Sequence, residues 1–307
     1  MTSRTAVVSW LLDSDPSIRW QVMRDLTDAD DAAVAVERTR VAEEGWAARL
    51  LEMQTHDGHW NDATEHGWMT TTDILQVLRD MGVDPASERV RNAIDRVNTR
   101  ITWFQIDGRP FFDGETEACI NGRILATGAY FGANVDRLLQ RLLSEQLDDG
   151  GWNCEAPPST RSSFHSTICV LEGLLAYETA RGPSVEVTQA RRRGENYLLE
   201  RRMLRALSSG EVIDNRWTSF AFPPVWHYDV LRGLDYLRMA GVRPGAQVAE
   251  AVALVESRRR EDGRWPQDTV HPDRMKRIPL DMEIEVGGPS RWNTLRALRV
   301  LDWYGAA

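Results

Sequence analysis

The chain has 307 residues and a formal charge of −9, with 42% hydrophobic and 27% charged residues, a balance typical of a folded protein rather than a disordered one. An acidic surface disfavours nucleic acid and anionic membranes as partners. The single lysine, Lys276, argues against Schiff-base chemistry and excludes a Walker-type phosphate loop, since both need a lysine in a defined setting.

Cysteine usage and the N-terminus favour a cytoplasmic protein. The three cysteines are too few and too scattered for a disulfide framework. The apolar stretch 6–12 is too short for the core of a signal peptide, and Asp13 and Asp15 follow it directly. No segment approaches the roughly 18 apolar residues that are needed to span a bilayer. We therefore expect a soluble cytoplasmic protein without a membrane span.

The chain begins with two short helical segments, 5–12 and 17–25, which the sequence Ser14-Asp15-Pro16 separates. An acidic run, Asp28-Ala29-Asp30-Asp31, follows in the next connection. Its carboxylates suit the N-terminus of a helix, where negative charge is favourable.

A repeated turn then recurs along the chain and accounts for part of the 12 tryptophans. Residues 54–60 and 146–152 both read Q-x-x-D-G-x-W, and residues 259–265 keep the D-G-x-W half. Weaker copies lie at Asp107-Gly108 and Asp214–Trp217, so that the spacing is about 50 residues. Gly or Asn after Asp predicts a tight turn with positive φ.

Each turn lies between a polar and an apolar helical segment. The polar segments precede the turns, at 86–103, 134–146, 186–206 and 246–260. The apolar segments follow them, at 67–82, 117–132, 162–178, 223–241 and 289–305. With the N-terminal pair this pattern predicts an all-α fold, a single (α/α)6 toroid of six helical hairpins that forms one domain over residues 1–307. A linear solenoid of helical pairs is the alternative, although its repeats usually run closer to 34–47 residues.

The Q-x-x-D-G-x-W turns before apolar helices resemble those of the terpenoid cyclase and protein prenyltransferase superfamily, over nearly the whole chain. The resemblance implies an (α/α)6 barrel in which the repeat is structural and a central cavity holds a hydrophobic small-molecule substrate. It is specific for the fold and not for the reaction.

The cyclases of this superfamily protonate their substrate with the middle aspartate of a D-x-D-D motif. Residues 28–31 match that motif formally, but their acidic, solvent-like context favours a helix N-terminus over catalysis. Polar residues at the starts of the apolar helices are the better candidates for acid–base catalysis, namely Asp73, His227 and Asp229.

The prenyltransferases of the superfamily bind zinc through an Asp-x-Cys pair and a histidine in the following repeat. Here Glu117 and Cys119 open one apolar helix and His165 opens the next, so the resemblance implies zinc as the cofactor and these three residues as its ligands. Glutamate replaces the usual aspartate. The alternative is that Cys119 packs as a small hydrophobic residue and that His165 is simply hydrogen-bonded.

Aromatic and polar side chains near the expected cavity mouth are the candidate substrate-binding residues, because aromatic faces stabilise cations. They are Trp68, Trp226, Tyr228, Trp292, Arg291 and Asn293. The alternative is that the aromatic rings only fill the space between helices. The long connection 267–289 carries Arg274, Lys276 and Arg277, which would suit a diphosphate or else form a solvated basic face.

These observations favour a prenyltransferase- or terpenoid cyclase-like enzyme that acts on an isoprenoid or other hydrophobic substrate, with possible help from zinc. Two alternatives remain open. One is a non-catalytic toroid that binds a lipid-like or peptide ligand, and the other is a purely structural toroid. The sequence does not indicate whether a partner subunit exists.

Overall fold

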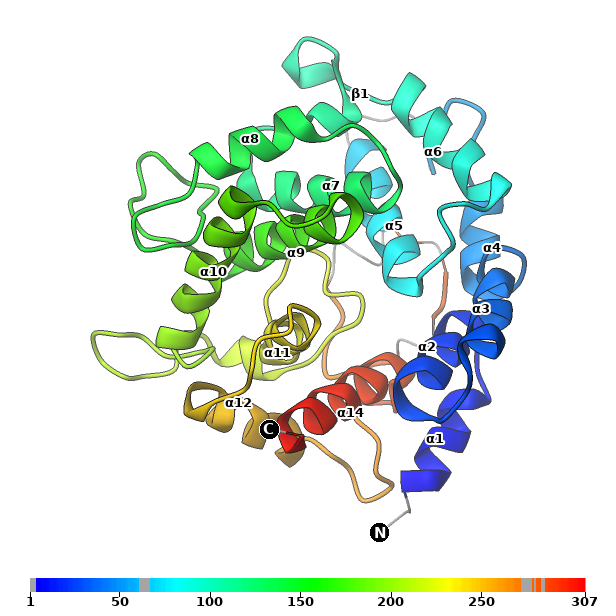
Figure 1. The fold of residues 1–307 in the computed structure, drawn as a ribbon, viewed down its shortest axis with the longest axis vertical. Coiled ribbons are helices and arrows are strands. Elements are labelled where there is room, and N and C mark those ends of the chain that lie inside the picture. Colours follow the sequence, from blue (N-terminus) through cyan, green and yellow to red (C-terminus); the bar gives the residue numbers. More distant parts are fainter. Residues whose placement is uncertain (1–3, 61–66, 272–277, 279, 283–284, 307) are drawn as a thin grey trace. The chain divides into compact units, whose positions relative to one another are not determined.

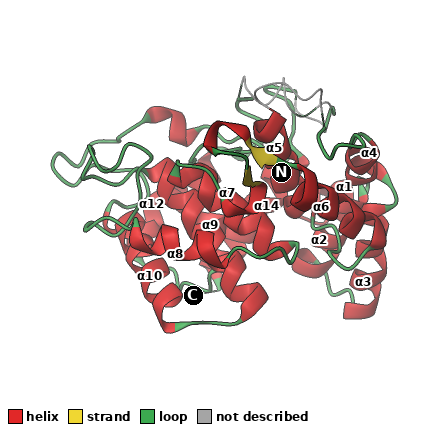
Figure 2. Ribbon diagram, turned by 90° about the horizontal axis from the view of Figure 1, so that it is seen from above, coloured by secondary structure: helices red, strands yellow, loops and turns green. Residues whose placement is uncertain are grey.

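The protein is mostly helical in a computed structural model, which describes residues 4–60, 67–271, 278, 280–282 and 285–306 (Figures 1 and 2). Its contacts divide the chain into two compact units. The first unit comprises Met1–Arg49, Met81–Asp84 and Leu199–Ala307, and the second comprises Leu50–Asp80 and Pro85–Leu198. The single domain expected from the repeats stays a prediction.

The first unit contains both ends of the chain. Its helices are α1 (Arg4–Leu12), α2 (Pro16–Leu26), α3 (Asp31–Thr39), the start of α4 (Gly45–Glu52), α11 (Val230–Met239), α12 (Ala249–Ser257) and α14 (Arg291–Gly305), with 3-10 turns at Arg40–Ala42, Asn215–Thr218 and Ala246–Val248. Helix α14 packs against α2, α11 and α12. A bidentate ion pair between Arg4 and Asp302 also joins the first helix to the last, with N···O distances of 2.8 and 2.6 Å.

The second unit is built around a close pair of helices. It contains most of α5 (Gly67–Met81), α6 (Glu88–Arg100), α7 (Ala118–Tyr130), α8 (Asp136–Ser144), α9 (Phe164–Arg181) and most of α10 (Val185–Glu200), with 3-10 turns at Phe104–Ile106 and Phe111–Asp113. Helices α7 and α9 lie side by side (Figure 1). Gly122 of α7 permits this close approach because it has no Cβ atom. A Cβ atom at that position would lie 2.5 Å from the backbone of Cys169 in α9.

Local capping explains where several helices begin. Asp15 caps α2 by accepting a hydrogen bond from the Ser17 amide at 2.9 Å, and Pro16 occupies the first turn of the helix. Asp30 caps α3 in the same way, through the Ala33 amide at 2.7 Å. The acidic run at 28–31 therefore serves a helix N-terminus, as its context predicted.

The repeated turns have nearly identical hydrogen bonds. The indole N–H of the turn tryptophan donates to a carbonyl ten residues earlier in all three copies, from Trp60 to Leu50, Trp152 to Leu142 and Trp265 to Val255, at 2.6–2.7 Å. The glutamines of the first two copies donate across to the next polar helix, Gln54 to the Ala93 carbonyl and Gln146 to the Ala190 carbonyl. In the third copy Arg259 stands at the glutamine position and lies over the Trp265 ring instead. The repeat is therefore a set of structural clamps.

Replacing Trp152 by phenylalanine should lower the free energy of unfolding by about 2 kcal/mol more than the same change at Trp292, because it leaves the buried Leu142 carbonyl without its donor. Trp292 is a matched control, since it is also buried but its indole N–H has no partner among the described residues. Urea unfolding of both variants tests this. Equal losses at the two positions would contradict it.

Helix boundaries differ most from the sequence expectations in two places. The segment expected as a helix over 223–241 becomes helical only at Val230, because the chain turns after the two prolines, with positive φ at Val225, and Asp229 caps the helix. The segment expected over 186–206 ends at Glu200, before two residues with positive φ, Arg202 and Met203. A small antiparallel pair, β1 (Thr102–Trp103) and β2 (Arg109–Pro110), was not expected at all. The Asp107-Gly108 turn joins these strands, with positive φ at both positions.

Candidate functional site

Glu117, Cys119 and Cys154 come together in the second unit, with one potential ligand atom from each lying within 4.8 Å of the others. Glu117 and Cys119 belong to the N-terminus of α7, where Glu117 precedes the first helical residue. Cys154 lies in the loop after the turn that ends at Trp152. That turn is fixed to α9, because the Trp152 amide donates to the Thr167 hydroxyl at 3.0 Å.

Backbone and side-chain hydrogen bonds hold Cys154 against α7. The Cys119 amide donates to the Cys154 sulfur at 3.2 Å. The Cys154 amide donates to Ser166 Oγ at 3.2 Å, and the same oxygen lies 3.2 Å from the Cys154 sulfur. The Cys119 sulfur lies 3.6 Å from a carboxylate oxygen of Glu117. Two thiols and a carboxylate are thus preorganised by two helices and one loop.

The pKa values of the two thiols shift in opposite directions. A hydrogen bond with the Cys154 side chain raises the pKa of Cys119, as do burial and the nearby negative groups. The same hydrogen bond lowers the pKa of Cys154, and together with hydrogen bonds to Ser166 and from the Cys119 amide it outweighs the opposing effects of burial and of Glu117. Cys154 is therefore the more acidic thiol of the pair, and it lies beside a helix N-terminus, which is the kind of environment that favours a reactive cysteine.

His165 lies outside this group of three. It is half-buried near the start of α9, next to Ser166, which contacts Cys154. The structure therefore brings together two of the three expected metal ligands, Glu117 and Cys119, and adds Cys154, which the sequence did not single out.

Asp73 is committed to a buried ion pair. Its side chain is fully buried on α5 and is bonded to the guanidinium of Arg123 on α7. The Nε of Arg123 also donates to Gln76 Oε1 at 2.5 Å. An aspartate in this setting is the counter-ion of a buried arginine, and its proposed catalytic role is untested.

Asp229 and His227 lie in the first unit, just before α11. Asp229 caps this helix by accepting from the Arg232 amide at 2.7 Å, and its carboxylate also accepts the Ala221 N–H. Burial raises its pKa, against the opposing influence of Arg296 and Arg232. His227 is half-buried in a stack of rings, 3.8 Å from Trp226 and 3.7 Å from His271. Trp226 and His227 precede the helix rather than lying on it.

The remaining candidate substrate-binding residues make mostly structural contacts. Tyr228 is buried and donates to the Met203 carbonyl at 2.6 Å. The side-chain amide of Asn293 donates through Nδ2 to the backbone carbonyls of Phe220 and Pro266. Trp292 stacks on Phe222 with 4.1 Å between ring centroids.

Arg291 and Trp68 belong to different units. Arg291 lies over the Trp10 ring and donates to the carbonyls of Trp10 and Asp13, so it fixes the N-terminal helix. Trp68, half-buried on α5, packs at 4.8 Å against Trp103. Of the basic loop residues, Arg274, Lys276 and Arg277 lie outside the described residues.

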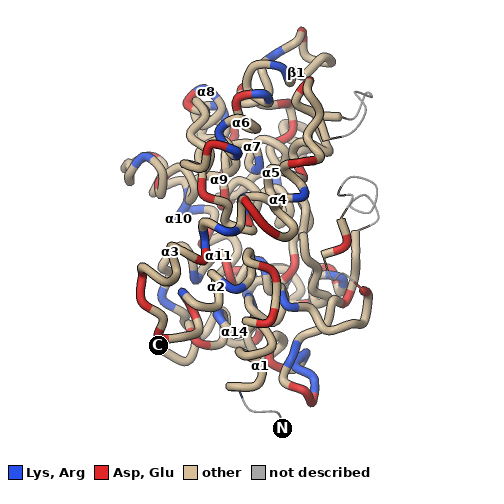
Figure 3. The backbone as a smooth tube through the Cα atoms, turned by 90° about the vertical axis from the view of Figure 1, so that its right-hand side faces the viewer, with Lys and Arg blue, Asp and Glu red and all other residues tan. Residues whose placement is uncertain are grey.

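Sequence reasoning missed the buried arginines. Arg123, Arg232, Arg296 and Arg299 are each at least 93% buried on α7, α11 and α14. The signal was a charged residue within an otherwise apolar helix. Elsewhere acidic and basic residues are interspersed along the chain (Figure 3).

The chain matches no known family model, and a search of curated proteins finds no match. Among the described residues, no helix combines the length and apolar character that a membrane crossing requires.

Proposed function

We propose that the protein is a cytoplasmic enzyme of the prenyltransferase or terpenoid cyclase type, a transferase or cyclase built as an (α/α)6 toroid that acts on an isoprenoid or other hydrophobic substrate. The observation that carries this proposal is the cluster of Glu117, Cys119 and Cys154 at the start of an apolar helix. The toroid is supported by the recurring tryptophan clamps and by the pairing of the first helix with the last.

The donor set fits zinc. Two thiol sulfurs and one carboxylate oxygen are a normal catalytic set for this ion, which leaves one coordination position open. The hydrogen bond with Cys119 lowers the pKa of Cys154, which eases formation of the thiolate that a metal ligand requires. When bound, zinc would lower the pKa of a coordinated thiol or water and so supply a nucleophile.

The protein's own residues would orient the site. Ser166 holds the loop through its bond to the Cys154 amide, and the Cys119 amide fixes the Cys154 sulfur. Glu117 is exposed, so its carboxylate lies on the side from which solvent reaches the cluster.

Zinc analysis of the purified protein tests the site directly. We expect one zinc per chain, with Cys119→Ser and Cys154→Ser each weakening binding by at least roughly 100-fold, since even outer-shell partners contribute 10–100-fold. Cys169→Ala is the matched control, because Cys169 is a buried free cysteine outside the cluster and its loss should leave the zinc content unchanged. The zinc content of His165→Ala shows whether His165 is a further zinc ligand.

A folded wild-type protein that binds no zinc would contradict the metal site. Incubation of the zinc-loaded protein with prenyl diphosphates and with uncharged polyprenes, followed by mass spectrometry, then separates transfer from cyclisation. Binding of these compounds without product would instead support the alternative, a non-catalytic toroid that holds a lipid-like ligand.

A further inference from the structure

One face of α14 places three large polar side chains in the interior of the first unit. Trp292, Arg296 and Arg299 follow one another at intervals of four and three residues, so they lie on one side of the helix. Their exposed fractions are only 4%, 7% and 7%. A buried guanidinium needs a counter-ion and hydrogen-bond acceptors, because removing its charge from water is costly.

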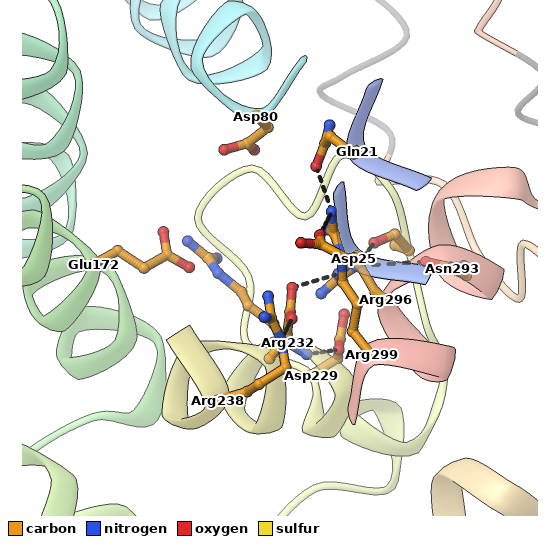
Figure 4. Close-up of polar contacts among 12 residues, drawn as sticks. Gln21, Asp25, Asp80, Glu172, Asp229, Arg232, Arg238, Asn293, Arg296 and Arg299 are labelled. Carbon is orange, nitrogen blue, oxygen red and sulfur yellow. Dashed lines mark hydrogen bonds and ion pairs between the residues drawn. The ribbon is translucent and has the colours of Figure 1, made fainter. Parts of the chain in front are cut away.

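Arg299 has both. Its Nη2 atom pairs with Asp25 and donates to Gln21 Oε1 at 3.0 Å (Figure 4). Burial lowers its pKa to about 10, and the charges of Asp25 and Asp235 limit that fall. Arg299 is therefore a structural cation in close contact with a carboxylate, which it shares with Arg24.

Arg296 is much less well paired. Within the described part of the chain its two hydrogen bonds both come from Nη1 and are long, 3.3 Å to the Ala221 carbonyl and 3.4 Å to Asn293 Oδ1. The nearest described carboxylate oxygen, on Asp235, lies 3.9 Å from Nε. The other oxygen of Asp235 accepts from Arg238 at 2.8 Å, so Asp235 already has a closer partner.

Asp229 compensates Arg296 only in part, because it is shared between two buried arginines. Its carboxylate accepts from the amides of Arg232 and Ala221, and burial raises its pKa while the charges of Arg296 and Arg232 oppose that rise. Asp229 and Arg296 therefore contact the same residue, since the Ala221 N–H donates to Asp229 and the Ala221 carbonyl accepts from Arg296. The close-up in Figure 4 shows Asp229, Arg232 and Arg296 gathered in this region.

Trp292 adds a second unused donor on the same helix face. Its indole N–H is buried and has no hydrogen-bond partner among the described residues. The ring stacks on Phe222 at an interplanar angle of 11°, and Trp46 lies 6.4 Å away. Two buried aromatic residues are thus neighbours of groups that contact or carry the guanidinium, since Phe222 follows Ala221, which accepts from Arg296, and Trp292 lies one turn before Arg296.

We propose that Arg296 and the indole N–H of Trp292 bind the carboxylate of an amphiphilic ligand whose apolar body packs near Phe222 and Trp292. The guanidinium fork matches the two oxygens of a carboxylate. A single guanidinium without a close ion pair suits a monoanion, whereas a diphosphate would need the charges of Arg238 and Arg299, which are already in contact with Asp235 and Asp25. This site is separate from the cysteine cluster and does not rest on the proposed function.

Calorimetric titration of the full chain with decanoate tests the proposal, with decanol, inorganic phosphate and pyrophosphate as comparison probes. We expect decanoate to bind at least 10-fold more tightly than any of the three. Arg296→Met should weaken decanoate binding at least 10-fold, and Trp292→Phe should weaken it several-fold by removing one donor while keeping the ring. Arg216→Met, which changes an exposed arginine paired with Asp214, should leave it unchanged.

The Tm measured without ligand distinguishes a loss of binding from misfolding of a variant. An unused cation stabilises the ligand-free protein little, so Arg296→Met should leave its Tm unchanged or raised, whereas Arg299→Met should lower it. The proposal is overturned if decanoate does not bind, if decanol or either phosphate binds as tightly, or if Arg296→Met lowers the Tm as much as Arg299→Met does.

Discussion

Replacing Arg123 by methionine is expected to lower the free energy of unfolding by about 3–5 kcal/mol, because it removes the guanidinium that pairs with the buried carboxylate of Asp73. Methionine fills a similar volume, so the loss comes mainly from the uncompensated charge. Gln76 Oε1 loses its donor in the same change and adds to the cost. Urea unfolding of the purified variant measures the effect.

The double variant Asp73→Leu/Arg123→Met separates charge from packing. Removing both partners should recover much of the loss, since replacing a buried ion pair by apolar residues is often close to neutral. Arg137→Met is the surface control. Its partner is Asp113, but its side chain is 85% exposed, so we expect a change below about 1 kcal/mol. A small effect of Arg123→Met would show that Asp73 is readily neutralised, and it would restore Asp73 as a candidate acid.

Helices with strong local signals could be predicted from the sequence. The segments expected over 117–132 and 289–305 correspond to α7 and α14, because a polar cap or turn precedes an apolar run in each. The N-terminal pair was predicted for the same reason, since Asp15 and Pro16 mark the start of α2. These signals lie within a few residues of the feature that they determine.

Predictions failed where neighbouring residues outweighed the apolar pattern. The region before Val230 has the hydrophobic residues of a helix, yet the chain turns there with positive φ at Val225, and Asp229 caps the helix only from Val230 onward. As a result Trp226, His227 and Tyr228 precede the helix on which they were expected. The short strand pair around Asp107 was missed because each strand is only two residues long, too short for an alternating pattern.

The candidate site was only half predictable. Glu117 and Cys119 are two residues apart, so their proximity follows from the sequence. Cys154 is 35 residues from Cys119 and reaches it only through the tryptophan turn and its contacts with α9. The arginine pairs are likewise non-local, since Asp73 lies 50 residues from Arg123. Spacing in the sequence does not show which carboxylate a buried guanidinium will meet.

Replacing Gly122 by alanine is expected to destabilise the protein by at least about 3 kcal/mol, the upper end of the usual cost of overpacking. The added methyl would lie 2.5 Å from the carbonyl carbon and oxygen of Cys169 and from the Val170 amide nitrogen. These are backbone atoms within a helix, so no side-chain rotation can relieve the clash and α7 must move away from α9. Gly305→Ala is the matched helical control. A Cβ atom added there would lie more than 4 Å from every described atom beyond its neighbours in the same helix, so the change should be neutral or slightly stabilising.

The same substitution should also reduce zinc binding, because the two helices carry different parts of the cysteine cluster. Cys119 lies three residues before Gly122 on α7, and Ser166, which holds Cys154, lies three residues before Cys169 on α9. Separating the helices therefore moves Cys119 away from Cys154. Zinc content measured below the unfolding transition distinguishes this effect from global unfolding. A folded Gly122→Ala protein that retains its full zinc content would show that the loop, and not the helix pair, positions the two sulfurs.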